Sequence, residues 1–129
     1  MNKLITFLST FLITLVFTAN VAIGADALNR ADTEKLIKGN TAEGVNTKWD
    51  KKMIWFFHEG GTLYKMKPSG KKGRAEWSLD KKGQLCYQDK HMDESICEPI
   101  IPRDDGKYDA NDGKWRFDKV LPGNTHNLN

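Results

Sequence analysis

From residue 40 onward, short segments rich in aromatic and β-branched residues alternate with turn-forming clusters roughly every ten residues. The clusters are built from Gly, Asn, Asp and Lys, which suit tight turns. A regular series of short strands with short connections is typical of a meander that closes into a barrel or folds into a sandwich. The spacing therefore predicts about seven strands and a mainly β fold, either a small antiparallel β-barrel or a sandwich.

The most clearly marked hairpin joins residues 52–58 to residues 62–67 through Glu59-Gly60-Gly61. In residues 74–79, apolar and polar side chains alternate, which predicts a strand with one face in water. Further strands are predicted over residues 84–88, 95–101, 107–110 and 114–120.

One short helix is predicted before the strands. Asp32 is a suitable N-cap, Leu36 and Ile37 provide an apolar side, and Gly39 stands where a left-handed C-cap residue belongs. We expect this helix to close one end of the domain.

Residues 1–24 have the pattern of a secretory signal peptide. Lys3 precedes an apolar run over residues 4–17, and Ala22 with Gly24 supplies the small residues that signal peptidase requires, as Ala25 with Ala27 also does. Cleavage after Gly24 would leave residues 25–129 as a single β domain with an N-terminal helix. The apolar run is shorter than the roughly 20 residues that span a bilayer, so we expect no transmembrane anchor. The expected product is a periplasmic or secreted monomer that has no nucleic-acid partner.

Cys86 and Cys97 are the only cysteines. An even number of cysteines in an exported chain predicts a disulfide between them. Their spacing is far longer than that of a redox-active dithiol, so the predicted role is structural.

Lys and Arg are in excess over residues 48–90, and Asp and Glu are in excess over residues 91–129. Lysines in turns keep a small β protein soluble and protect its sheet edges. A binding surface for acidic glycans, lipid headgroups or a partner protein is the alternative.

Large aromatic side chains are expected to form the inner layer, namely Trp55, Phe57, Trp77, Trp115 and Phe117, together with Leu85. If the barrel is hollow, Trp55, Tyr64, Trp77, Tyr87 and Trp115 would lie near a small apolar or amphipathic ligand. If the barrel is filled, we expect function on the loops, above all on the Cys86 to Cys97 hairpin with His91 and Met92 near its tip.

Several of these features together resemble a family of small exported proteobacterial proteins that is defined by a domain of unknown function. They are Gly39-Asn40-Thr41, Glu59-Gly60-Gly61-Thr62, the segment from Gly73 to Trp77, Leu85-Cys86 with Cys97, and Gly123-Asn124 with Leu128. The resemblance implies a lipocalin-like small barrel and implies no reaction. A lipocalin begins its first strand with Gly-x-Trp, whereas Gly44 and Trp49 are five residues apart here.

No pattern of catalytic or metal-binding residues is evident. His58, His91 and His126 are far apart in the sequence, and the aspartates between residues 104 and 113 fail the EF-hand template, so neither a zinc nor a calcium site is predicted. Ser69 and Ser78 lack the context of a nucleophile, and no phosphate-binding loop is present. We therefore expect a binding module rather than an enzyme, without a cofactor. Its partner is an unknown small ligand or, alternatively, a protein of the cell envelope that it inhibits or binds through the Cys86 to Cys97 loop.

Overall fold

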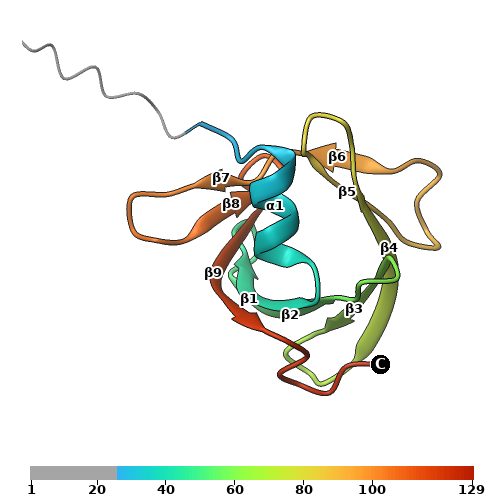
Figure 1. Ribbon diagram of the computed structural model, residues 1–129. Helices are drawn as coiled ribbons and strands as arrows, with labels where there is room; N and C mark the ends of the chain where they lie inside the picture. The colour runs from blue at the N-terminus through green and yellow to red at the C-terminus, as the bar shows by residue number, and fades with distance from the viewer. Residues whose placement is uncertain (1–25) are drawn as a thin grey trace, which may run out of the picture.

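The computed structural model describes residues 26–129, and the predicted signal peptide, residues 1–24, lies outside the described residues. The described chain forms one curled, half-barrel sheet of nine antiparallel strands, with one short helix across an end of it (Figure 1). The prediction of a mainly β fold is therefore confirmed. Because the strands belong to a single sheet, the barrel-like alternative is the one observed.

The elements follow one another with short connections. In chain order they are α1 (Arg30–Ile37), β1 (Asn40–Asn46), β2 (Lys51–Phe57), β3 (Thr62–Met66), β4 (Lys72–Leu79), β5 (Leu85–Gln88), β6 (Ile96–Glu98), β7 (Ile101–Pro102), β8 (Tyr108–Ala110) and β9 (Trp115–Pro122).

The sheet order is β6-β5-β4-β3-β2-β1-β9-β8-β7, so β6 and β7 form its two edges. These edge strands are consecutive in the chain and are joined by Pro99 and Ile100. The backbone N–H of Leu28 donates to the carbonyl of Ile100 at 2.8 Å, which ties the segment before α1 to this junction. The gap in the half-barrel is therefore bridged by the chain itself.

Helix α1 begins earlier than predicted. The side chain of Asn29 caps it by accepting a hydrogen bond from the backbone N–H of Asp32 at 2.8 Å, so the expectation that Asp32 is the N-cap was wrong. Asp32 instead lies in the first turn, where its negative charge favours the helix N-terminus. Gly39 follows the helix with a φ of +72°, as its predicted role requires.

Two differences concern the strands. No strand was predicted over Asn40–Asn46, yet β1 lies at the centre of the sheet between β2 and β9. The predicted strand over residues 95–101 is divided into β6 and β7 at Pro99, which has no N–H to donate to a ladder.

Each face of the sheet buries part of the chain. The inner face packs Trp55, Phe57 and Trp77 against Ile37 of α1 in one core. On the outer face, residues 123–129 begin at β1, where the hydroxyl of buried Thr41 donates to the carbonyl of Gly123 at 2.6 Å, and end beside β3 and β4, where Leu128 lines a hollow with Tyr64.

Candidate functional site

Four of the five aromatic residues predicted to surround a ligand lie together inside the half-barrel. The Trp55 ring packs 5.1 Å from the Trp115 ring and 5.9 Å from the Tyr87 ring, measured between centroids. Trp77 packs edge-on against Phe57 at 5.6 Å. Trp55 and Trp77 are buried, so these side chains form a core in which each ring contacts others.

Tyr64 does not join this group. It lies on the outer face of β3, stacked on Phe56 with ring centroids 6.2 Å apart, and the Arg74 guanidinium lies over its ring at 5.3 Å. The preceding residue, Leu63, is the one that enters the core, because successive side chains of a strand point to opposite faces.

The interior group also holds polar atoms. Asn111 donates to the hydroxyl oxygen of Tyr87 at 2.9 Å. The indole N–H of Trp115 is buried and makes no hydrogen bond of good geometry among the described residues, although it lies near enough to the Tyr87 hydroxyl to affect its pKa. Burial raises the pKa of the Tyr87 phenol, the nearby Trp115 indole opposes that shift, and the negative charge of Asp89 adds to it. Tyr87 is therefore a protonated hydroxyl at neutral pH.

The Cys86 to Cys97 loop has the predicted disulfide, which joins residues directly opposite in β5 and β6. Within the loop His91 is exposed and Met92 is half-buried. Gln88 holds the loop by donating to the carbonyl of Met92 at 3.1 Å and accepting from the hydroxyl of Ser95 at 3.1 Å. The loop is thus ordered by the residue at its base.

A groove that was not predicted follows the outward face of β4. Three adjoining hollows of about 270, 290 and 500 Å³ share lining residues and run from α1 to the disulfide-bounded loop. Their floor includes Arg74, Glu76 and Ser78. One wall is the β2–β3 turn at residues 59–62, and the other contains residues of β5 and of the loop up to Ser95. We call this surface the β4 groove.

The β4 groove is mainly polar. Glu59, Glu76, Arg74 and Lys90 line it without an ion pair to any other described residue. Trp77 also lines it, but this side chain is only 9 % exposed and its indole donates inward to the carbonyl of His58. The sequence did not reveal the groove because its residues come from five separate segments of the chain.

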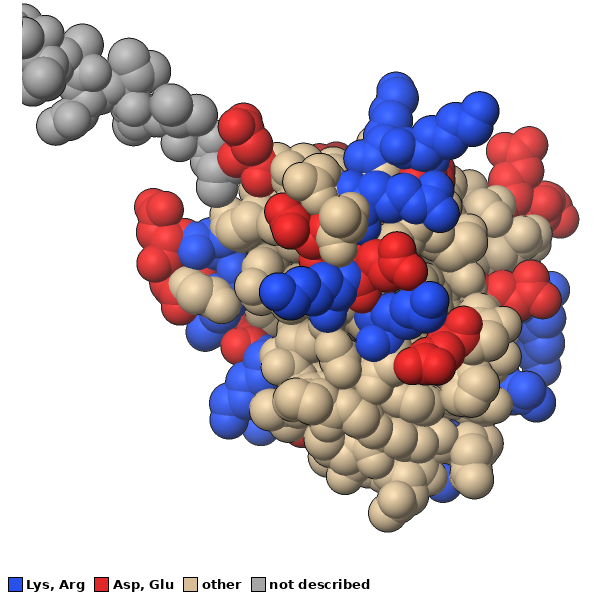
Figure 2. Space-filling view, in the orientation of Figure 1, with Lys and Arg blue, Asp and Glu red and all other residues tan. Residues whose placement is uncertain are grey.

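Charged side chains of both signs are interspersed around α1, and an uncharged area lies below the helix, on the side where the chain ends (Figure 2). The predicted excess of basic residues over residues 48–90 therefore does not form a separate basic face in this view.

Comparisons of the chain with protein-family models, curated proteins and solved structures gave no match. Within residues 26–129, α1 is the one helix, and it is too short and too polar to cross a membrane.

Proposed function

We propose that this protein is a binding module that holds an extended segment of a partner polypeptide in the β4 groove, with the disulfide-bounded loop as one wall. The observation that supports this proposal is the continuity of the three hollows along β4. From Leu79 to Arg74 the floor has five residue steps, or about 17 Å at the rise of a β-strand. A segment of about five or six residues fits that length.

The spacing of the side chains along the floor of the β4 groove matches the spacing of side chains in an extended peptide. Arg74, Glu76 and Ser78 are alternate residues of one strand, so their side chains recur about every 6.7 Å. Side chains of an extended peptide recur at the same interval. The walls add hydrogen-bonding groups from Thr62, Gln88 and Ser95, so both N–H and C=O groups of a peptide would find partners.

The chemistry of the groove favours a peptide over a glycan. Sugar rings are commonly held against exposed aromatic faces, and the one aromatic residue of the groove has its ring packed into the core. Glu59 and Glu76 are carboxylates without ion pairs among residues 26–129. They would attract Lys or Arg in the middle of the bound segment, and Arg74 with Lys90 would attract an acidic residue at one end.

The loop that forms one wall is already ordered. Besides the bonds from Gln88, Asp89 forms an ion pair with Lys65 at 3.7 Å and accepts from the backbone N–H of His91 at 2.8 Å. A preorganised wall lowers the entropic cost of binding. The disulfide is also the type of crosslink found in oxidising compartments, which supports export and an envelope or extracellular partner.

The test uses a phage-displayed library of random dodecapeptides, selected against the oxidised protein, followed by anisotropy titration of the enriched peptides. We expect enriched peptides with a central Lys or Arg, and we expect Glu76→Arg to weaken their binding at least tenfold. Asp104→Arg makes the same charge reversal in the exposed β7–β8 turn, outside the groove, and should leave binding unchanged. No enrichment, or equal binding by Glu76→Arg, would refute the proposal.

A second candidate is capture of a small apolar or amphipathic molecule by Trp55, Tyr87 and Trp115. The indole N–H of Trp115 favours it, because this buried group makes no hydrogen bond of good geometry among residues 26–129 and a ligand carbonyl could accept one from it. Native mass spectrometry of the protein recovered from its source tests this candidate. An added mass that is lost on denaturation supports it, and a bare oxidised chain speaks against it.

A further inference from the structure

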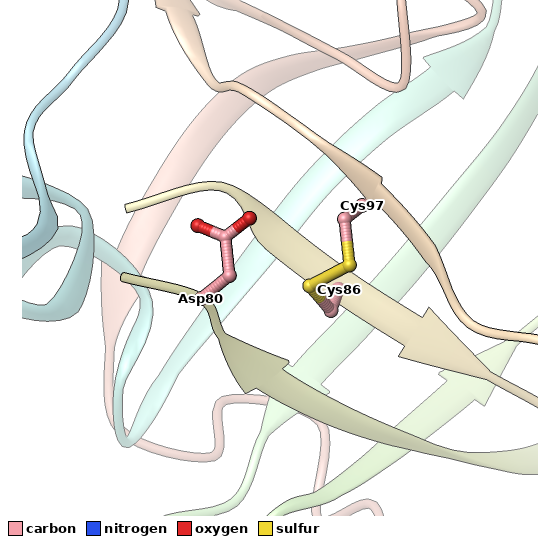
Figure 3. A group of neighbouring side chains, drawn as sticks. All are labelled: Asp80, Cys86 and Cys97. Atoms are coloured by element: carbon pink, nitrogen blue, oxygen red, sulfur yellow. A yellow bond between two sulfur atoms is a disulfide. The ribbon is translucent and has the colours of Figure 1, made fainter. Parts of the chain in front are cut away.

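Asp80 lies beside the disulfide (Figure 3). A carboxylate oxygen of Asp80 and the sulfur atoms of Cys86 and Cys97 are all within 4.8 Å of one another. The three side chains come from different elements: Asp80 follows β4, Cys86 belongs to β5, and Cys97 belongs to β6. The sheet therefore brings one hard and two soft potential ligands to the same point.

One oxygen of Asp80 is already used and the other is free. Oδ1 accepts hydrogen bonds from the backbone N–H groups of Lys82 at 2.9 Å and Gln84 at 2.8 Å, which hold the carboxylate in place. Oδ2 accepts no hydrogen bond from residues 26–129, and Asp80 forms no ion pair there. Asp80 can thus offer a fixed oxygen without losing its structural bonds.

The two sulfur atoms would stay close in the reduced protein. Cys86 and Cys97 are paired across two strands, and the ladder continues on both sides with Leu85 opposite Glu98 and Tyr87 opposite Ile96. A tetrahedral zinc ion needs its two sulfur ligands about 3.8 Å apart, at Zn–S distances of about 2.3 Å. We expect rotation of the two side chains within this ladder to reach that separation.

We propose that the reduced protein binds one Zn²⁺ through Cys86, Cys97 and Asp80, with water as the fourth ligand, so that the disulfide and the metal exclude each other. Two thiolates and a carboxylate form a donor set that suits zinc. The proposal goes beyond peptide binding and does not depend on it.

The chemistry balances with a dithiol as the reductant. The dithiol transfers two electrons and two protons to the Cys86–Cys97 bond, giving two thiols and a disulfide in the reductant. Zn²⁺ then replaces the two thiol protons, which are released to solvent. Reoxidation by a disulfide reverses both steps and expels the metal.

The experiment uses the full chain, reduced with a water-soluble phosphine, freed of reductant under anaerobic conditions and titrated with Co²⁺ and then Zn²⁺. We expect one Co²⁺ per chain with a thiolate-to-cobalt charge-transfer band and the strong visible bands of a tetrahedral ion, and we expect Zn²⁺ to remove both. The oxidised chain should give neither. A stoichiometry other than one, or a spectrum without the charge-transfer band, would overturn the proposal.

Variants separate the ligands from the fold. Asp80→Asn keeps an oxygen for the N–H groups of Lys82 and Gln84, and should weaken Zn²⁺ binding at least tenfold. Asp105→Asn changes another carboxylate that accepts a backbone N–H, in the β7–β8 turn outside the proposed site, and should leave the affinity unchanged. If Asp80→Asn and the unchanged chain bound Zn²⁺ with equal affinity, Asp80 would not be a ligand and the assignment would be refuted.

Circular dichroism of the reduced chain completes the test. We expect the β spectrum to be retained with and without Zn²⁺, because the remaining strands pair independently of β6. If the reduced chain loses this spectrum and Zn²⁺ does not restore it, the proposed site does not form.

Discussion

Gly44 in β1 lies so close to Arg116 in β9 that a Cβ atom on Gly44 would be 1.9 Å from the Arg116 carbonyl oxygen. The register between these strands shifts at this point, so that Asp118 forms a bulge opposite Glu43 and Gly44. Only a residue without a side chain allows the two strands to approach in this way.

Gly44→Ala should therefore destabilise the protein. The methyl group has to push β1 and β9 apart, and overpacking of this kind costs about 2–3 kcal/mol. Thermal unfolding followed by circular dichroism should show a fall in Tm of roughly 10 °C. Gly73→Ala is the control, because its Cβ would meet only the flexible end of Lys65 at 4.0 Å. Similar losses for both variants would contradict the steric explanation.

Strand β1 was difficult to predict because its own residues do not favour a strand. Asn40–Asn46 contains Asn, Glu and Gly, residues with low strand propensity. Its strand conformation comes from pairing on both sides, with the following strand β2 and with β9, which is remote in sequence. The strands that were predicted, such as β2 and β4, carry their own pattern of aromatic or alternating residues.

The candidate site was predictable to a similar degree. The interior position of Trp55, Trp77 and Trp115 follows from aromatic residues on strands that alternate between faces. Tyr64 was predicted with them as a large aromatic residue of a predicted strand, but it lies on the outer face, and its neighbour Leu63 points inward. The β4 groove depends on contacts between five segments, which no local pattern reports.

Gly83 provides a second test of close backbone approach. A Cβ on Gly83 would be 2.4 Å from the Arg30 backbone nitrogen at the start of α1, and its φ is +84°. Gly70 has nearly the same φ, +83°, but no heavy atom within 4 Å. Both alanine variants bear the cost of a left-handed conformation, about 1 kcal/mol. In urea unfolding, Gly83→Ala should lose clearly more free energy of unfolding than Gly70→Ala. Hydrogen exchange in α1 should accelerate in Gly83→Ala and stay unchanged in Gly70→Ala.

Loss of the disulfide should weaken one edge of the sheet rather than the whole fold. The crosslink closes a loop between residues 11 apart in sequence, for which the chain-entropy model gives about 3 kcal/mol. The double variant Cys86→Ala with Cys97→Ala should lose about that much in urea unfolding. Hydrogen exchange should increase first at Ile96–Glu98, since β6 is an edge strand of the described sheet and is paired there with β5. Exchange that increases equally in β1 and β9 would contradict this view.

Asp118 should make stability depend on pH in the acid range. The hydrogen bond from Arg116 holds the pKa of the Asp118 carboxyl below its ordinary value of 3.8, and the positive charge of Lys107 adds to this. A carboxyl whose pKa is lowered by folding stabilises the protein above its unfolded pKa, and this contribution is lost as the pH falls below about 4 through the folded pKa. Between pH 5 and pH 2, the Asp118→Asn variant should therefore lose less stability than the unchanged protein. Urea unfolding at several pH values measures it, and parallel curves for both proteins would refute it.

The C-terminal segment, residues 123–129, is held on the outer face of the sheet by two different interactions, one at β1 and one near β3 and β4. Thr41 is fully buried, and its hydroxyl donates to the Gly123 carbonyl and accepts from the Thr125 N–H at 3.2 Å. Leu128, farther along the same segment, is 1 % exposed. If both anchor one segment, their contributions to stability should be coupled.

Thr41→Val keeps the shape of the side chain but leaves the two backbone groups of the segment without their partner, which should cost about 1–2 kcal/mol. Leu128→Ala should cost about 2–3 kcal/mol by removing a buried side chain.

The double variant should lose less stability than the sum of the two single losses, by at least about 0.5 kcal/mol. The reason is that once one change has released the segment, the second change removes little further stabilisation. Thr41→Val combined with Ile96→Ala is the control. Ile96 is exposed on β6 at the sheet edge, so the losses of stability from these two changes should be additive. Additivity of Thr41→Val with Leu128→Ala would mean that the two residues stabilise the outer face separately.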